Sequence, residues 1–358
     1  MTRLRHWATL FRQHFANRIW FWAGIIISML FVWWAVRGLR LAEVWQDLLD
    51  ANYWWLIPGI LVYFFGVWAR TWRWHYMLRP FKAIPLRRLF PMVCIGYAGN
   101  NIYPARAGEV LRSYVLKRAD DISMSTSLAT VFVERLFDGL VMIMFVLFAL
   151  PFTASIPSQY RAWVIGFSLL FAVALVIFLA IAARPLIARR LYDQIALHII
   201  PARFRARLGD IVDRFLEGLA SLRSGRDVMM IFTTSIVIWL AETMKYWFVM
   251  HAFDFHVSFM VLMLMNGIVN LFTTLPAAPG YIGTFDAPGI EILASVGGVN
   301  RAVAAAYTVV LHAALWIPIT ALGVYYLYHQ RLHWSDVERA SELVEAETRG
   351  SGPDESPS

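Results

Sequence analysis

The sequence contains few charged residues. Asp, Glu, Lys and Arg make up only 16% of its 358 residues, whereas a typical soluble domain carries about a quarter. Apolar residues make up 59% and the mean hydropathy is +0.56. Because the apolar residues gather in long runs, they argue against a large soluble domain and predict membrane-spanning helices. We therefore expect an all-α polytopic membrane protein.

Cysteine and established catalytic motifs are also scarce. Cys94 is the only cysteine, which excludes an internal disulfide, and no Cys/His cluster of the kind that binds a metal is present. The sequence contains no H-E-x-x-H, G-x-S-x-G or phosphate-binding G-x-x-x-x-G-K motif. We expect no cofactor, no metal and no catalytic residues, and hence a protein that is not an enzyme.

The net charge is nevertheless positive, at +8. A basic protein can bind nucleic acid, but here the Lys and Arg residues lie mainly in the connections between apolar runs. That distribution is the one that the positive-inside rule describes for membrane proteins. We therefore expect membrane lipids, and not nucleic acid, as partners.

Six apolar runs are long enough to span a bilayer. At about 1.5 Å per residue, each covers most or all of a hydrocarbon core about 30 Å thick. These runs are 19–36, 53–69, 122–149, 162–183, 228–250 and 302–328. The first follows a basic segment, 1–18, and lacks a small-residue cleavage site, so we interpret it as a retained helix and not a signal peptide.

Two further apolar stretches, 88–117 and 258–296, are each interrupted in the middle. The interruptions contain Pro104 and Gly108 in the first stretch, and Pro276, Pro279, Gly280 and Gly283 in the second. Proline and glycine at this density stop a helix, and each remaining side is about half a bilayer long. We expect each stretch to form a re-entrant helical hairpin, with a pair of kinked spanning helices as the alternative.

Loop charges predict the orientation of the chain. With six spans and two re-entrant hairpins, the Arg-rich connections 70–90 and 184–227 lie on one side of the membrane. The positive-inside rule places that side and both termini in the cytoplasm, with the protein in the inner (plasma) membrane. Segment 184–227 is expected to form an amphipathic helix on the inner leaflet. The tail, 331–358, is acidic and then rich in Gly, Ser and Pro, and part of it is expected to be disordered.

The membrane domain is expected to cover 19–330, in two halves of about 19–150 and 162–328. The halves resemble each other at an offset of 172 residues. Ala69–Trp74 aligns with Ala241–Tyr246, Pro104 with Pro276, and Gly108 with Gly280. The order of elements also repeats, as two spans, a broken hairpin and one span. Because the hairpins enter from opposite sides, this order predicts an inverted repeat, which transporters use to place broken helices around a central site.

Polar residues next to the first break form the main candidate site. Charged groups at membrane depth are costly and by default mark a substrate path. Arg106 and Arg112 are suited to bidentate binding of a lipid phosphate, while Glu109 orients one of them or takes a proton. The alternative is an ion pair that only holds the hairpin together. The candidate substrate-binding residues are Asn101, Arg106, Glu109, Arg112, Glu134, Arg135 and Asp138.

Three of these residues lie within the predicted span 122–149. Glu134 and Asp138 are four positions apart and share a helix face. We expect Arg106 or Arg112 to be their partners, with a purely structural network as the alternative.

The second break is a candidate gate or second half-site, or else a turn whose acids, Asp286 and Glu291, lie at the outer interface. The candidate hinge and gate residues are Pro104, Gly108, Pro276, Pro279, Gly280, Gly283 and Asp286.

Two other polar positions are expected to be structural. Glu242 and Lys245 are three residues apart and predict an ion pair, and His312 on an apolar helix predicts a core histidine with satisfied hydrogen bonds.

A resemblance to a known family rests on the polar residues at the two breaks. The chain is similar to the lysylphosphatidylglycerol synthetase transmembrane-region family at Asn101, Pro104, Arg106, Gly108, Glu109, Arg112, Glu134, Arg135, Asp138, Pro279, Gly280, Gly283 and Asp286. The resemblance covers about residues 20–330 and implies a flippase-like membrane domain. Where family members often carry Glu, this chain has Asp286.

In bifunctional members of that family, such a domain moves aminoacylated phosphatidylglycerol between leaflets, and a separate cytosolic domain makes this lipid. Since the sequence leaves no room for the synthetic domain, the resemblance implies lipid translocation without aminoacylation. Stand-alone relatives are associated with hopanoid, glycolipid or polyprenyl-phosphate handling. We expect translocation of an anionic, phosphate-bearing or glycosylated isoprenoid lipid. The alternatives are a scaffold or accessory subunit of a lipid-modifying or glycosyltransferase enzyme, and an intramembrane enzyme acting on a lipid phosphate.

Overall fold

The computed structural model describes residues 22–103, 106–152 and 224–330, with a few scattered helical positions between 166 and 213. All regular structure in these residues is helical, which confirms the predicted all-α class. The predictions for 1–18, 162–183, 184–227 and 331–358, and for Pro104, fall wholly or mostly outside the described residues.

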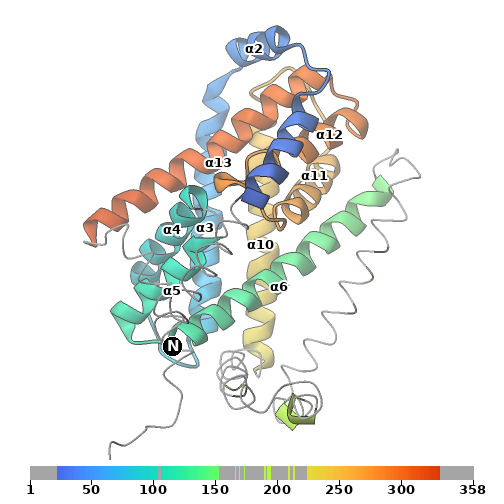
Figure 1. Ribbon diagram of the computed structural model, residues 1–358. Coiled ribbons are helices and arrows are strands. Elements are labelled where there is room, and N and C mark those ends of the chain that lie inside the picture. The colour runs from blue at the N-terminus through green and yellow to red at the C-terminus, as the bar shows by residue number, and fades with distance from the viewer. Residues whose placement is uncertain are drawn as a thin grey trace, which may run out of the picture.

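Two long helices, α3 (Leu56–Leu78) and α10 (Gly225–Met250), lie side by side through the middle of the molecule (Figure 1). Glycines of α3 face α10 at this contact. A Cβ at Gly66 would lie in ordinary van der Waals contact with Ala241, 3.7 Å from its Cβ. Helix α3 continues to Leu78, whereas the sequence predicted a span that ends at 69, because its arginines are buried in the bundle and do not belong to a loop.

Each interrupted stretch folds as two helices that pack against each other. The first consists of α4 (Leu86–Ile102) and α5 (Ala107–Asp120), and the second of α11 (Phe259–Phe272) and α12 (Asp286–Ser295). A short 3-10 helix, η4 (Pro279–Tyr281), lies in the second break. The two pairs occupy opposite ends of the α3–α10 pair (Figure 1). The breaks therefore fall where the proline and glycine positions predict them.

Glycines also let the two helices of the first hairpin approach closely. A Cβ at Gly108 on α5 would lie only 1.9 Å from the carbonyl oxygen of Gly96 and 2.5 Å from the amide nitrogen of Asn100, both on α4. Since real Cβ atoms do not come this close to backbone, only glycine fits at this position.

Two further long helices cover the hairpins. Helix α6 (Met124–Ala149) packs on α5 and α11, while α13 (Arg301–His329) packs on α4 and α12. At the N-terminal side, α1 (Trp22–Val36) is followed at an angle of 83° by α2 (Leu41–Asp50). The remaining 3-10 turns are η1 (Tyr53–Trp55) and η2 (Leu150–Phe152).

Among the described helices, α10 and α13 are each long and apolar enough to cross a bilayer, and α1 with α2 adds a third if the bent pair counts as one. Helix α6 has sufficient length at 26 residues. It carries three charged residues in its middle, Glu134, Arg135 and Asp138.

The outward faces of the helices are strongly apolar. Large side chains such as Trp22, Trp33, Leu61, Phe148 and Ile317 each expose more than half of their surface. Exposed apolar surface on this scale marks contact with lipid or with another protein. It is consistent with a protein embedded in a membrane.

Candidate functional site

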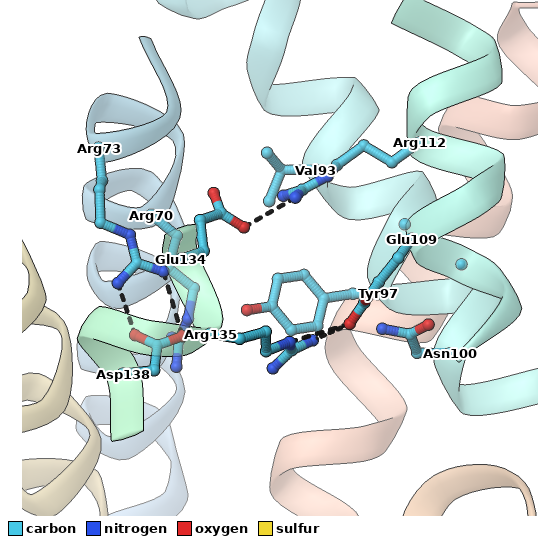
Figure 2. A pocket seen from close by; sticks show the side chains of 12 residues that line it. Arg70, Arg73, Val93, Tyr97, Asn100, Glu109, Arg112, Glu134, Arg135 and Asp138 are labelled. Atoms are coloured by element: carbon cyan, nitrogen blue, oxygen red, sulfur yellow. Dashed lines mark hydrogen bonds and ion pairs between the residues drawn. The ribbon is translucent and has the colours of Figure 1, made fainter. Parts of the chain in front are cut away.

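A cluster of ionisable side chains lies where α3, α4, α5, α6 and α10 meet; most of them are buried or half-buried, and Arg135 is the exposed member. The cluster surrounds two cavities, a small one of about 30 Å³ and a central one of about 140 Å³. The small cavity is lined by Arg70, Arg73, Val93, Gly96, Tyr97, Asn100, Gly108, Glu109, Arg112, Glu134, Arg135 and Asp138. Figure 2 shows three ion pairs directed into this space, with the Tyr97 ring between them.

The first ion pair joins α3 to α6. The guanidinium of Arg73 donates to both carboxylate oxygens of Asp138, at 2.5 and 3.2 Å, and to the hydroxyl of Ser235 on α10 at 2.8 Å. The indole of Trp239 donates to the same carboxylate at 2.9 Å. The Arg73 side chain is only 2% exposed. The pair therefore ties three helices together and neutralises a deeply buried guanidinium.

The second ion pair joins the first hairpin to α6. Arg112 donates to Glu134 at 2.7 Å, and its guanidinium lies 4.4 Å from the ring centre of Trp74. Such cation–π packing stabilises a partly desolvated arginine. One of the predicted partnerships, between Arg112 and an acid of α6, is therefore confirmed.

The third group surrounds Glu109. Arg135 donates to this carboxylate through two nitrogens. Arg106 approaches it only to 3.8 Å, and its own hydrogen bond, of 2.9 Å, goes to the carbonyl oxygen of Thr273 at the end of α11. Its guanidinium also lies 5.9 Å from the ring of Tyr281. Arg106 thus reaches across from the first break to the second.

A fourth group centres on Glu242 of α10. Lys245, three residues further along the helix, donates to this carboxylate, which confirms the predicted pair. Arg70 of α3 reaches the other carboxylate oxygen at 3.5 Å, and its guanidinium lies over Trp239 and Tyr97, at 5.2 and 5.8 Å. Arg70 therefore shares a carboxylate that a second cation already holds.

The central cavity lies between the two helix breaks. Its walls come from both halves of the chain: Tyr63, Arg70, Tyr97, Asn100, Asn101, Arg106, Arg135, Asp138, Trp239, Glu242, Tyr246, Asn270, Thr273, Gly280, Tyr281, Phe285, His312, Leu315 and Trp316. A volume of about 140 Å³ is several times the ~10–15 Å³ that one water needs by this measure. The cavity therefore has room for a phosphate-sized group.

Arg70 and Arg106 both line the central cavity, and each has only a share of a carboxylate. Across the whole cluster, six cations (Arg70, Arg73, Arg106, Arg112, Arg135 and Lys245) contact four carboxylates (Glu109, Glu134, Asp138 and Glu242). This leaves an excess of two positive charges. Arg70 is buried, while the side chains of Arg106 and Arg135 are 26% and 44% exposed. A surplus of positive charge around a cavity attracts an anion, and the buried Arg70 gains most from one.

The second break is held by a histidine. His312 contacts a carboxylate oxygen of Asp286 and the carbonyl oxygen of Gly280, and Asp286 accepts a hydrogen bond from the amide of Gly283. His312 is largely buried with both ring nitrogens engaged, as the sequence predicted. Asp286 lies inside the bundle beside the cavity wall, whereas Glu291 pairs with Arg301 away from both cavities.

The structure separates two arginines that the sequence grouped together. Arg106 lines the central cavity, while Arg112 lines the small one and is engaged by Glu134. Asn101 lines the central cavity and donates to Thr320 at 2.7 Å, which ties the first hairpin to α13. The prolines Pro276 and Pro279 shape the second break but do not line either cavity.

Several cavity residues were not predicted from sequence: Arg70, Arg73, Tyr97, Trp239, Tyr246 and Asn270. The spacing of residues on α3 could have indicated that Arg70 lies on a buried helix face. A helical stripe at intervals of three or four residues runs through Tyr63, Val67, Arg70 and Trp74. Among the described residues, no group of three His, Cys, Asp or Glu side chains has the arrangement of a metal site.

Comparison with known proteins identifies relatives of the whole membrane domain. A UPF0104 membrane protein of Methanothermobacter thermautotrophicus is 25% identical over 299 residues, which cover 79% of this chain and 87% of that protein. A UPF0104 membrane protein of Pyrococcus horikoshii is 23% identical over 331 residues, which cover 86% of this chain and 96% of that protein. A Haloferax volcanii protein named glycosyltransferase AglD is 23% identical over 339 residues, covering 86% of this chain but only 54% of that protein.

The sequence profile described as the lysylphosphatidylglycerol synthase TM region matches residues 21–323. This range contains both hairpins, α3, α6, α10, most of α13 and every residue that lines the two cavities. The protein therefore belongs to the family of the lysylphosphatidylglycerol synthase transmembrane region and is a membrane protein.

Proposed function

We propose that the protein translocates an anionic, phosphate-bearing lipid between the leaflets of the plasma membrane. The observation that carries this proposal is the central cavity, where Arg70 and Arg106 face a common space with incomplete carboxylate partners. Arginine is suited to phosphate because its planar fork donates two hydrogen bonds at once. The headgroup enters between the breaks, while the acyl or isoprenoid chains stay among the apolar helices.

The remaining predicted substrate-binding residues support the site from around it. Asn101 lines the same cavity, and Glu109 and Arg135 hold one another beside Arg106. Arg112, Glu134 and Asp138 fix the positions of α5 and α6 through their ion pairs. The hinge and gate role proposed for Pro104, Gly108, Pro276, Pro279, Gly280, Gly283 and Asp286 rests on their places in or beside the two breaks.

A topology of six spans with two re-entrant hairpins in an inverted repeat accommodates this function. At an offset of 172 residues, α3, α4, α5 and α6 correspond to α10, α11, α12 and α13. The packing supports the repeat, since the contact of α4 with α13 has its counterpart in the contact of α11 with α6. In this topology both termini are cytoplasmic, and the two breaks are the half-sites that open in turn.

Individual contacts support the same symmetry. Arg70 and Glu242 are 172 residues apart and touch each other. At the same offset, Arg73 corresponds to Lys245 and Tyr63 corresponds to Ser235. The contact of Arg73 with Ser235 therefore has its counterpart in the contact of Lys245 with the Tyr63 ring. Such exchange of partners is expected when two helices cross at a pseudo-two-fold axis.

Replacing Arg70 or Arg106 with Gln is expected to reduce the anionic lipid that copurifies with the detergent-extracted protein. The loss of one charge-assisted contact, about 1.5–3 kcal/mol, corresponds to a fall of about tenfold or more. Mass spectrometry of the bound lipids measures it. Arg301→Gln is the matched control, because Arg301 pairs with Glu291 outside both cavities, and its lipid profile should equal that of the wild type.

Translocation itself is tested in proteoliposomes. Fluorescent phosphatidylglycerol, with phosphatidylcholine as the zwitterionic comparison, is followed as it becomes accessible from the other leaflet. The wild type is expected to move the anionic lipid faster than the Arg70→Gln and Arg106→Gln variants do. Equal rates for protein-free vesicles, wild type and variants would exclude translocation of phosphatidylglycerol, and equal bound lipids would reduce both arginines to a structural role.

A second function, as an accessory subunit of a glycosyl-transferring enzyme, is favoured by one observation. The relative named glycosyltransferase AglD contains a region similar to this chain within about half of its length. On this proposal, the protein copurifies stably with a glycosyltransferase. Arg106→Gln leaves the activity of that complex intact, whereas substitutions within the sequence segment 184–227 abolish it.

A further inference from the structure

His312 of α13 lies between two hydrogen-bond acceptors. Its Nδ1 is 2.8 Å from a carboxylate oxygen of Asp286, and its Nε2 is 2.7 Å from the carbonyl oxygen of Gly280. A neutral imidazole has one N–H and can serve only one of these oxygens, whereas an imidazolium has two. A neutral histidine beside a protonated Asp286 carries the same number of protons as an imidazolium beside an ionised Asp286. The geometry therefore requires one bound proton shared by the His312–Asp286 pair.

The pair is held rigidly. The other carboxylate oxygen of Asp286 accepts a hydrogen bond of 2.8 Å from the amide of Gly283. The Phe285 ring lies 4.5 Å from the imidazole, and the side chains of His312 and Asp286 are only 14% and 16% exposed. Turning the imidazole ring would break these contacts. The carbonyl of Gly280 therefore has a hydrogen-bond donor only when Nε2 of His312 carries a proton.

Gly280 connects this pair to the central cavity. Its φ angle is +72°, and a Cβ at this position would lie 2.7 Å from the indole nitrogen of Trp316 and 3.6 Å from the carbonyl oxygen of Asn101. The indole in turn approaches the same oxygen of Asn101, at 3.4 Å. The second break is thus pressed against the first, and both Gly280 and His312 form part of the cavity wall.

Other charged and titratable groups face the same region. From α10, Lys245 is held by Glu242, which itself lines the cavity. Helix α2 packs on α13 but has no residue in the cavity. The ionisable groups that share the cavity wall with His312 are Tyr63 and Arg70 from α3, Tyr97 from α4, Arg106 and Tyr281 from the breaks, Arg135 and Asp138 from α6, and Glu242 and Tyr246 from α10.

We propose that His312 and Asp286 form a proton-binding site that latches the second break, so that lipid movement is linked to proton binding. With the proton bound, both ring nitrogens donate and Gly280 is held against α13. When the proton leaves to water through the cavity, the lone pair of Nε2 faces the carbonyl of Gly280. The two repel each other, the break is released, and the cavity opens. The transport part of this inference rests on the proposed lipid translocation, while the protonation state does not.

Asp286→Asn provides a sharp test because it keeps the geometry without the proton. The asparagine oxygen accepts from the Gly283 amide, and its NH₂ donates to the bare Nδ1 of a neutral His312. The Nε2–H of that histidine then serves Gly280. The variant should therefore hold the latch closed at every pH, whereas His312→Gln removes it.

Protonation is measured first, on full-length protein with ¹⁵N-labelled histidine in nanodiscs. The His312 resonances are assigned by their loss in His312→Gln and are followed from about pH 5 to about pH 9. Wild-type protein is expected to show an imidazolium, or a proton shared with Asp286, and Asp286→Asn a neutral ring. A neutral His312 ring beside an ionised Asp286 over the whole range would overturn the inference, whether or not the protein transports lipid.

Transport is then compared in proteoliposomes across the same pH range. Wild-type protein and the control His256→Gln, an exposed histidine outside the site, should show a pH dependence of about five- to tenfold, typical of a coupling between two sites. Asp286→Asn should be slow and independent of pH. Transport by Asp286→Asn with the wild-type pH profile would contradict the proton latch. Absence of transport in the wild type and in all variants would instead count against lipid translocation. The histidine resonances would then still show whether His312 and Asp286 bind a proton.

Discussion

Replacing Gly108 with alanine is expected to stop the first hairpin from closing. The added Cβ would lie 1.9 Å from the carbonyl oxygen of Gly96 and 2.5 Å from the amide nitrogen of Asn100. Both are backbone atoms of α4, so no flexible side chain can move away, and the two helices must separate. The cost should exceed the ~1–3 kcal/mol of ordinary overpacking, and it should appear as a large drop in the thermal unfolding midpoint of the detergent-solubilised protein.

Gly225→Ala is the matched control for this substitution. Gly225 begins α10, and apart from its chain neighbours and its own helix backbone no atom lies within 4 Å of the place that its Cβ would take. Its unfolding midpoint should equal that of the wild type or rise slightly, because alanine has the higher helix propensity. If Gly108→Ala and Gly225→Ala unfold alike, the close approach of α4 and α5 does not contribute to stability.

Removing the charge of Arg73 is expected to be the most destabilising single change in the ion cluster. Arg73→Met leaves the carboxylate of Asp138 buried with the indole of Trp239 as its remaining donor. Breaking a buried pair in this way costs about 3–5 kcal/mol. Adding Asp138→Asn removes the orphaned charge and keeps an acceptor for the indole, so the double variant should recover more than half of the loss.

Denaturation in detergent, followed by circular dichroism, gives the free energy of unfolding of the wild type, of Arg73→Met and of the double variant. Arg40→Met serves as the reference, because Arg40 precedes α2 and forms an exposed pair with Glu43. This variant should unfold like the wild type. A double variant that is less stable than Arg73→Met would show that Asp138 has another cation as its main partner.

Much of the fold follows from sequence because it depends on local chemistry. The helix breaks were predicted from Pro104, Gly108 and Pro279, since proline and glycine disturb a helix wherever they occur. The pair between Glu242 and Lys245 was predicted for a similar reason, because residues three apart meet on any helix. These features need no knowledge of distant contacts.

The centre of the site could not be predicted in the same way. Arg70 and Arg73 stand at the end of an apolar run, where an arginine usually marks the start of a loop. Their burial depends on Asp138, which is 65 residues away, and on Glu242, which is 172 residues away. Likewise, the short spacing from Arg106 to Arg112 suggested one shared ligand. The left-handed backbone of Arg106, with φ +56°, instead turns its side chain toward Thr273, while Arg112 follows the helix toward Glu134.

The contact between Arg70 and Glu242 also bears on how the chain assembles. These residues occupy equivalent positions in the two halves but carry opposite charges. Two first halves, brought together in the same way, would set a guanidinium against a guanidinium, and two second halves a carboxylate against a carboxylate. Like charges in a low-dielectric interior repel strongly. During biosynthesis, this single position therefore favours the pairing of α3 with α10 over the pairing of α3 with a copy of itself, and helps to keep newly made chains from exchanging halves.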